Sequence, residues 1–385
     1  MASAVKPAER ITSLDGVRGV AAMVVLVHHT MLVMPSLAAP YYQAHATSSV
    51  TWLIYSPVHI FWAGGEAVFV FFVLSGFALT YPVVTRPKFD WLAYYPARLV
   101  RLYIPVIASV IIAAVFLLAV PRIGMTSTSR WMLNHVEALT PRGFFGDATL
   151  TAPDLMNSPL WSLKWEVLFS LALPLYVWIA FTLRRQWWLV LAASLTLGAV
   201  GVALGSRPLT YLPIFMHGCV VAVRLDDLLA LRAWLERVPL GRVACWIALL
   251  VAVLAVTSTW TTATYNTSLA SAFTPLVLAG ALLFVLLAIV WPHGATALKA
   301  RPVQWLGSIS FSLYLVHEPI VVSIGILMPR QDIGLVPVVA IPLGLLAGWL
   351  FWRFVEKPSH RLAKLLSARV TAATQVRRER IAAGA

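Results

Sequence analysis

The stretch LDGVRGVAAMVVLVHHT, from Leu14 to Thr30, sets the fold class of the whole chain. It opens with charged residues, continues as an apolar run, and places His28 and His29 toward its far end. A helix that crosses the hydrocarbon core of a bilayer needs roughly 20 apolar residues. Ionisable side chains within such a run are costly, and by default they mark function. The stretch therefore predicts a transmembrane helix that carries functional groups.

The composition of the 385 residues extends this prediction to the whole chain. Hydrophobic residues make up 60% and charged residues only 11%, with a mean hydropathy of +0.83. A soluble domain carries about 25% charged residues. The sequence thus predicts an all-α, polytopic integral membrane helix bundle. About ten transmembrane helices are expected from the apolar runs, near residues 16–35, 57–81, 102–120, 160–182, 187–205, 208–223, 243–260, 270–291, 303–328 and 334–355.

The basic residues gather in every second connection between these spans, which predicts the orientation of the chain. The connections near 36–56 and 261–269 have no Lys or Arg. By the positive-inside rule both termini are cytoplasmic, in a multi-pass protein of the cell membrane. The net charge of +14 is therefore assigned to topology and the lipid bilayer, and nucleic acid is not expected as a partner. The basic residues are Lys6, Arg10, Arg86, Lys88, Arg98, Arg101, Arg184, Arg185, Arg224, Arg232, Arg237, Arg242, Lys299, Arg301, Lys357, Arg361, Lys364 and Arg369.

The remaining segments predict a simple domain organisation. We expect a transmembrane domain over residues 1–360 and a basic cytoplasmic tail over 361–385. The connection 121–158 has no clear helical period, and its length is typical of a lid or a binding element. Cys219 and Cys245 have no spacing typical of a disulfide framework or a metal centre, so no metal is expected.

The first span places two ionisable groups on one side of a helix. Arg18 and His29 are eleven positions apart, which corresponds to about 16 Å of helical rise. Eleven steps of the helix return to within about 20° of the starting direction, so both side chains share one face. His28 points about 100° away from His29. The span therefore predicts a link between its basic inner edge and an imidazole farther out.

Three further spans bring ionisable groups to a depth similar to that of His29. If the second span is helical from Pro57, Glu66 lies about 13 Å below the outer surface. Glu166 lies about 10 Å deep in the fourth span, and His317 falls in the outer half of the ninth. A single buried histidine is more often a structural, hydrogen-bonded residue. Coincident depth on separate helices instead favours one shared polar site.

The inner edge of the bundle has its own cluster of arginines. Arg18 lies at the cytoplasmic edge of the first span, and Arg98 and Arg101 precede the third and share one helix face. One interpretation is that each arginine reaches out to lipid phosphates. The other is a ligand with several phosphate groups, which guanidinium groups bind well.

Six short motifs, in order, resemble those of the acyltransferase 3 family, a family of membrane-bound O-acyltransferases. The resemblance covers residues 12–360 and has modest departures, among them Ser170 and Phe311 where Tyr is usual. The motifs are the Arg18 to His29 spacing; Phe71, Phe72, Ser75, Gly76 and Phe77; Arg98, Arg101 and Pro105; Trp161, Ser162, Glu166 and Pro174; Ser310, Tyr314, His317 and Pro319; and Glu356 with Pro358.

The resemblance implies transfer of an acyl group, often acetyl, from cytoplasmic acyl-CoA to a hydroxyl of a glycan or of a secondary metabolite such as a macrolide. Acyl-CoA is then a co-substrate, and no permanently bound cofactor is expected. Direct transfer and a transient acyl-imidazole both remain open. The implied roles are catalysis for His29, Glu166 and Arg18; donor binding for Arg18, Arg98, Arg101 and Ser75; and acceptor binding for Glu66, Tyr314, His317, Trp161 and Trp165.

Two alternatives belong to other functional classes. A transporter of a glycan or small molecule would use the intramembrane His and Glu groups as a proton relay. Such transporters show internal repeats, and no repeat is visible in this sequence. A structural or sensory membrane protein is the third interpretation. The family also has members with an added SGNH-type esterase domain; none follows the tail here, so we expect a stand-alone form that completes the transfer itself.

Overall fold

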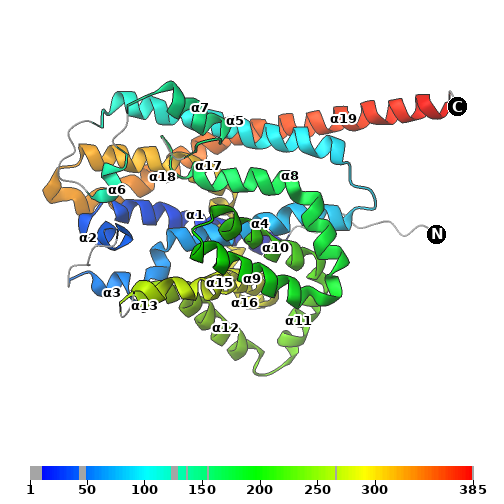
Figure 1. Cartoon of the computed structure of the whole chain (residues 1–385), viewed down its shortest axis with the longest axis horizontal. Helices are drawn as coiled ribbons and strands as arrows, with labels where there is room; N and C mark the ends of the chain where they lie inside the picture. Colours follow the sequence, from blue (N-terminus) through cyan, green and yellow to red (C-terminus); the bar gives the residue numbers. More distant parts are fainter. Residues whose placement is uncertain are drawn as a thin grey trace. The chain divides into compact units, whose positions relative to one another are not determined.

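The computed structural model describes residues 11–42, 49–122, 129–135, 138–153, 156–264 and 267–383, and Figure 1 traces them. Every regular element in these ranges is a helix, which confirms the all-α prediction. Lys6 and Arg10, used above for orientation, lie outside the described residues.

The described helices include seven that are long and apolar enough to cross a membrane. The helices Thr12–Leu32 and Pro35–Tyr42 are separated by a short break with a bend of 113°, and they add an eighth span if they are counted together as one. The protein is thus a polytopic membrane helix bundle, as predicted. Two further apolar helices, Arg207–Val223 and Gly241–Val256, fall where the sixth and seventh spans were expected but are shorter. The count of about ten spans and the orientation of the termini stay predictions.

The chain divides into two compact units, and each is built from two separate stretches of sequence. Unit 1 comprises Met1–Pro87 and Trp165–Ser310, and unit 2 comprises Lys88–Lys164 and Phe311–Ala385. Two helices contribute residues to both units, α8 (Leu160–Thr182) and α17 (Arg301–Leu327).

Unit 1 is centred on the apolar helix α15 (Thr274–Val290), which packs against α1 (Thr12–Leu32), α4 (Gly64–Thr85) and α12 (Gly241–Val256). Its other elements are α2 (Pro35–Ala38), η1 (Ala39–Tyr42), α3 (Thr51–Ile54), η2 (Pro57–Trp62), η3 (Arg184–Gln186), α9 (Trp187–Ala203), α10 (Arg207–Val223), α11 (Leu225–Arg237), α13 (Ser258–Ala263), α14 (Thr267–Ala270), η4 (Ser271–Phe273) and α16 (Pro292–Leu298).

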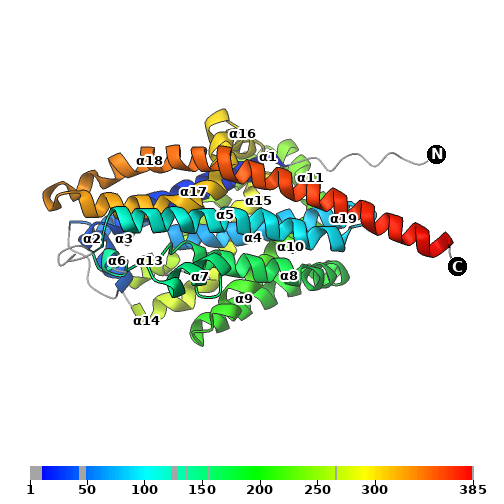
Figure 2. The ribbon, with the colours of Figure 1, turned by 90° about the horizontal axis from the view of Figure 1, so that it is seen from above.

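Glycines permit a close contact between two helices of unit 1. Helices α4 and α10 lie side by side in Figures 1 and 2. A Cβ atom on Gly76 of α4 would collide with the backbone of Phe215, and one on Gly218 of α10 would collide with the backbone of Val73. Small residues let membrane helices approach closely, and van der Waals packing then stabilises the pair. The glycine of the Phe-Phe-x-x-Ser-Gly-Phe motif therefore has a packing role.

Unit 2 contains a long helix pair that Figures 1 and 2 show side by side, α5 (Trp91–Ala119) and α19 (Lys357–Ala383). The hydroxyl of Thr371 on α19 donates to Asp90, the residue that caps α5, at 2.7 Å. The remaining elements are α6 (Arg130–Leu133), α7 (Pro141–Thr149), η5 (Arg330–Leu335), α18 (Val336–Phe351) and the π-helix η6 (Trp352–Glu356).

The structure corrects the second span. It is not one continuous helix from Pro57, because the short 3₁₀-helix η2 ends at Trp62 and α4 begins afresh at Gly64. Ser56 caps η2 by accepting from the backbone N–H of Val58. Glu66 thus lies in the first turn of α4, and the depth calculated from Pro57 loses its basis.

The connection 121–158 also differs from its expected irregular form. It contains α7, which begins after Thr140, whose hydroxyl accepts from the backbone N–H of Gly143, and has Pro141 in its first turn. Both features favour a helix start. Nine residues are too few to establish a helical period in the sequence.

Candidate functional site

The predicted site residues divide between the two units. Each of these residues lies on a helix. Their convergence on one site would require residues of both units, and it stays a prediction. Unit 1 holds Arg18, His29, Glu66, Ser75, Trp165 and Glu166, whereas unit 2 holds Arg98, Arg101, Trp161, Tyr314 and His317.

Arg18 and His29 both lie on the unbroken helix α1, as their spacing predicted. Both side chains are half-buried, and His28 beside them is buried. The rings of His28 and His29 meet edge to face, with centroids 5.3 Å apart. The end of α1 is thus a pair of touching imidazoles.

His28 belongs to a cluster of five rings in unit 1, which we name the aromatic cage: His28, Tyr41, His59, Trp62 and Trp260. The ring of His59 lies 4.3 Å from that of Trp62 and stacks on Trp260 at 4.4 Å. Tyr41 lies 4.4 Å from Trp260. The residues come from four separate segments, so tertiary packing alone brings them together.

Hydrogen bonds fix the imidazoles of the cage. Nδ1 of His28 donates to the carbonyl of Trp62 at 2.9 Å, so the neutral ring carries its lone pair on Nε2. The Tyr41 hydroxyl lies 3.1 Å from Nε2 of His59. Nδ1 of His59 is buried and has no hydrogen-bond partner among the described residues.

Burial keeps the His59 imidazole neutral. Loss of hydration, followed by the nearby His28, lowers the pKa of His59 from 6.5 to about 3. A low-dielectric environment disfavours the charged form of an imidazole. The cage therefore contains an uncharged histidine at neutral pH.

Glu66 connects the cage to helix α4. Its Oε1 atom accepts a hydrogen bond of 2.8 Å from the indole N–H of Trp260. The carboxylate is half-buried and also lines an apolar cavity that runs beside α1. This placement agrees with a role in binding a polar group of a ligand.

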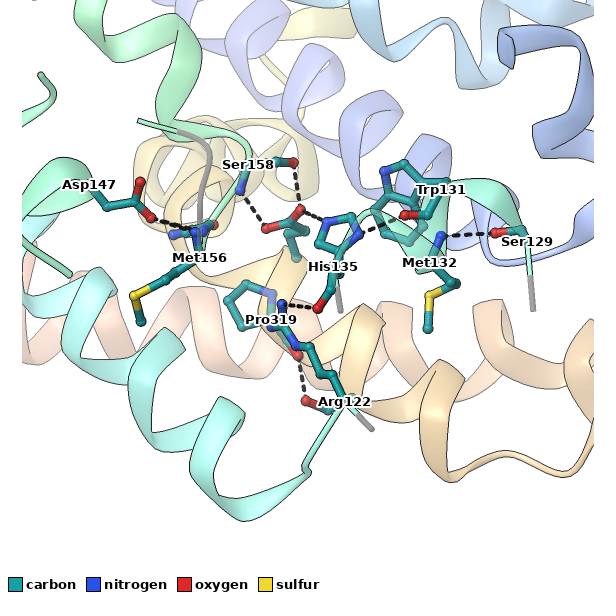
Figure 3. A network of polar contacts seen from close by, with 12 residues as sticks. Arg122, Ser129, Trp131, Met132, His135, Asp147, Met156, Ser158 and Pro319 are labelled. Atoms are coloured by element: carbon teal, nitrogen blue, oxygen red, sulfur yellow. Dashed lines mark hydrogen bonds and ion pairs between the residues drawn. The ribbon is translucent and has the colours of Figure 1, made fainter. Parts of the chain in front are cut away.

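Unit 2 has a second polar cluster, which we name the Glu318 clasp: Glu318, His135 and Ser158. Figure 3 labels His135 and Ser158 of this clasp. Oε1 of Glu318 lies 2.5 Å from both Nε2 of His135 and the hydroxyl of Ser158. Oε2 accepts from the backbone N–H of Ser158 at 2.8 Å. One carboxylate of α17 thus holds two distant points of the connection 121–158.

Further bonds hold the segments around the clasp. Nδ1 of His135 donates to the carbonyl of Trp131 at 2.8 Å, and the buried guanidinium of Arg122 donates to the carbonyl of His135 at 3.1 Å. The amide of Asn157 donates to the carbonyl of Leu315 at 2.8 Å. Both nitrogens of His135 are therefore engaged in contacts within the clasp.

Two predicted acceptor residues lie on α17 just before Glu318. The Tyr314 hydroxyl is 2.7 Å from the hydroxyl of Ser162, near the start of α8. His317 is buried, and its Nδ1 donates to the carbonyl of Leu313 at 2.8 Å. That bond leaves the lone pair of the neutral ring on Nε2.

The predicted donor arginines of unit 2 lie on α5. Arg98 is half-buried and Arg101 is exposed. Nε of Arg101 donates to Nε2 of His360 at 3.0 Å, and His360 lies 3.6 Å from the buried carboxylate of Glu356. That carboxylate accepts from the hydroxyl of Ser312 at 2.5 Å. Glu356 of the closing motif thus lies next to the histidine that accepts from Arg101.

The remaining predicted residues are Trp161, Trp165, Glu166 and Ser75. Trp165 is buried, with its ring 5.5 Å from that of Tyr211. Trp161, Glu166 and Ser75 are half-buried on their helices. Among the described residues, no three His, Cys, Asp or Glu side chains are grouped to hold a metal ion.

Sequence reasoning missed His59, Trp260, His135 and Glu318. Glu318 carried a signal, because it is an ionisable residue inside an apolar span, next to His317. His59 was absorbed into the second span, where the Ser56-Pro57 pair is in fact a helix start. Neither Trp260 nor His135 had any local signal, since their partners are 194 and 183 residues away.

Comparisons with known proteins identify a family. The sequence model of the acyltransferase 3 family, described as an acyltransferase domain, matches residues 11–353. A relative, "Acyltransferase MdmB" of Streptomyces mycarofaciens, is 28% identical over 184 residues, covering 46% of this chain and 43% of the relative. The match thus spans less than half of that relative's length. No solved structure matches. With nearly its whole length matched by the family model, the chain belongs to the acyltransferase 3 family.

Proposed function

We propose that this chain is an O-acyltransferase of the cell membrane that uses acyl-CoA from the cytoplasm. It moves an acyl group, acetyl above all, to a hydroxyl of a glycan or of a glycosylated metabolite such as a macrolide. Family membership supports acyl transfer in general. The observation that carries the finer proposal is helix α1, which holds Arg18 and His29 on one unbroken helix with His29 against the aromatic cage.

His29 acts as the base in this proposal. In direct transfer its imidazole takes the proton of the acceptor hydroxyl while the oxygen bonds to the thioester carbonyl carbon. The carbon–sulfur bond breaks, and the CoA thiolate takes the proton back from the imidazolium. In the two-step route, the imidazole nitrogen bonds to the carbonyl carbon and displaces the thiolate, which takes a proton from the ring. The hydroxyl then attacks the acyl-imidazole, the carbon–nitrogen bond breaks, and the hydroxyl proton returns to the imidazole. Glu166 or Glu66 orients His29 or holds the acceptor in either route.

Arginines hold the donor. Arg18, Arg98 and Arg101 bind the phosphate groups of CoA, because a guanidinium pairs with phosphate through two parallel hydrogen bonds. Ser75 adds a hydroxyl on the donor side. Tyr314, His317, Trp161 and Trp165 line the acceptor side, where aromatic faces suit a sugar or a macrocycle.

Turnover of radiolabelled acetyl-CoA tests the proposal. The full chain in nanodiscs is assayed for CoA release, alone and with glycans and macrolides, as wild type and as His29→Ala. We expect release in the wild type that one acceptor accelerates, and loss of release in the variant with acetyl-CoA binding retained. A folded His29→Ala protein with full acyl transfer contradicts the proposal.

Acetyl-CoA binding tests the donor site separately. Arg98→Ala and Arg101→Ala each weaken binding about tenfold, as expected for loss of a hydrogen-bonded charge pair. Arg185→Ala, on the exposed segment η3, is the matched control and leaves binding unchanged. Added salt weakens wild-type binding, because ions screen exposed charges. If neither the substitutions nor added salt changes acetyl-CoA binding, the assignment of Arg98 and Arg101 to the donor site is wrong.

A further inference from the structure

Unit 1 contains an apolar groove that none of the roles above explains. Its volume is about 590 Å³, and α1, α4, α12, α15 and α16 form its walls. Val20, Val24, Phe284 and Ala288 are typical of its lining. Among the described residues that line it, Glu66 and His293 alone carry ionisable side chains. The groove therefore suits a hydrocarbon ligand with a small polar part.

The length of the groove matches that of a lipid chain. On α12 the lining runs from Trp246 to Val256, ten residues apart and so about 15 Å. The hydrocarbon core of a bilayer is roughly 30 Å thick, so the groove is as long as the chains of one leaflet. Val20 is 45% exposed and Trp246 is 58% exposed, so the groove has an open side on apolar helices.

The polar end of the groove selects the ligand's head group. Glu66 lies there, with one oxygen already bonded to Trp260 of the aromatic cage. The oxygens of this side chain accept hydrogen bonds, which a hydroxyl supplies and the carbonyl oxygen of a thioester cannot supply. The hydrocarbon ligand that fits is thus an alcohol, which makes it the acceptor rather than the donor.

We propose that this groove binds the hydrocarbon part of a lipid-like acyl acceptor, whose hydroxyl group is held by the carboxylate of Glu66. The inference rests on the proposed function and narrows its acceptor to an alcohol carried on an apolar chain. The acceptor then enters from the bilayer, where such molecules concentrate, with its hydroxyl at the cage that borders His29.

Photolabelling tests the groove without relying on catalysis. The full chain in nanodiscs is irradiated with a dodecanol that carries a diazirine in its chain, and labelled peptides are mapped. We expect labels on residues 17–24, 246–256 and 284–298. Unlabelled dodecanol competes about tenfold better than dodecyl methyl ether, as expected for one buried hydrogen bond. In Glu66→Gln this preference falls to near one.

Two matched tryptophan substitutions separate the groove from general lipid contact. Val20→Trp fills the groove and lowers labelling severalfold. Leu250→Trp, which is 57% exposed on α12 and outside the groove, leaves labelling unchanged. Labels spread evenly over all lipid-facing helices, or equal competition by alcohol and ether in the wild type, overturn the proposal. The competition result decides even if Val20→Trp does not fold.

Acyl transfer then separates this inference from the proposed function. Transfer of acetyl from acetyl-CoA to dodecanol, lost in Val20→Trp and kept in Leu250→Trp, supports both. Specific labelling with transfer only to hydrophilic glycans overturns the acceptor assignment. Specific labelling with no transfer to any acceptor contradicts the proposed function, while the alcohol site itself stands.

Discussion

The aromatic cage of unit 1 and the Glu318 clasp of unit 2 both bury histidines, but they treat the imidazole in opposite ways. In the clasp, both nitrogens of His135 are engaged, one by a carbonyl and one by a carboxylate. In the cage, rings surround the imidazoles, and Nδ1 of His59 has no hydrogen-bond partner among the described residues.

This difference separates a structural histidine from a reactive environment. A buried polar network whose members are bonded adds rigidity, whereas a partly bonded one is costly and persists where function requires it. We therefore interpret the clasp as a structural contact that stabilises the connection 121–158. We interpret the cage as the environment of the proposed base His29. The following predictions test this contrast between a structural clasp and a functional cage.

The largest expected effect is on catalysis in unit 1. His29→Ala lowers kcat for acyl transfer by about 10²–10⁴-fold, the range found for loss of a general base. Its resistance to denaturation stays near that of the wild type, because His29 is only half-buried. Steady-state kinetics beside denaturant unfolding measure the two quantities. If His29→Ala loses both stability and activity, His29 has a structural role like that of the clasp, and the contrast between the two clusters is wrong.

The next largest effect is on stability in unit 2. Glu318→Ala lowers the free energy of unfolding by about 1–3 kcal/mol, because it leaves the buried Nε2 of His135 without its hydrogen-bond partner. Hydrogen exchange of residues 138–153 then rises. Glu356→Ala, which removes another buried carboxylate of unit 2, is the control and leaves that exchange unchanged. If Glu318→Ala leaves exchange at the wild-type level, the clasp is not an anchor.

A smaller effect appears on acidification. The folded pKa of His59 is about 3 and its unfolded value is 6.5, so between these values the unfolded state binds more protons. Stability therefore falls as the pH drops through this window, by up to about 1.4 kcal/mol per pH unit from this group. His59→Phe, which does not titrate, has a shallower slope between pH 6 and pH 4. Identical slopes for the two proteins refute the buried, neutral assignment.

The smallest effect concerns the link between the cage and Glu66. Trp260→Phe keeps an aromatic ring but removes the N–H that Glu66 accepts. We expect KM for the acceptor to change about fivefold, in keeping with about 1 kcal/mol for one hydrogen bond, with kcat nearly constant. The split between KM and kcat is the measurement. An equal fall of kcat places Trp260 closer to the chemistry than proposed.

Hydropathy and charge predicted the helical membrane fold because both act locally along the chain. Each expected span overlaps an apolar helix, since burial in lipid requires a continuous apolar run. The sequence did not predict the break after Trp62, because Gly64 and Gly65 lie inside an apolar stretch and are compatible with a continuous transmembrane helix. The helix α7 escaped because its cap residues, Thr140 and Pro141, also suit a turn.

The placement of the candidate site residues on helices was predictable, because their spacing lies within apolar runs. Arg18 and His29 do lie on one helix. What the sequence could not supply was the partner of each group. Trp260 meets Glu66 across 194 positions, and Glu318 meets His135 across 183. No local pattern encodes such pairs, because they depend on how apolar helices of similar composition choose their neighbours.

The clasp also sets an order for biogenesis. Glu318 is synthesised 183 residues after His135, a delay of roughly 10 to 40 s at ordinary translation rates of about 5–20 residues per second. Throughout that time the first half of unit 2 waits without its carboxylate, while most of unit 1 is made. In a nascent chain that stalls before Glu318, the connection 121–158 therefore lacks its bonds to the carboxylate and is more susceptible to membrane proteases. Synthesis of α17 ends this susceptibility.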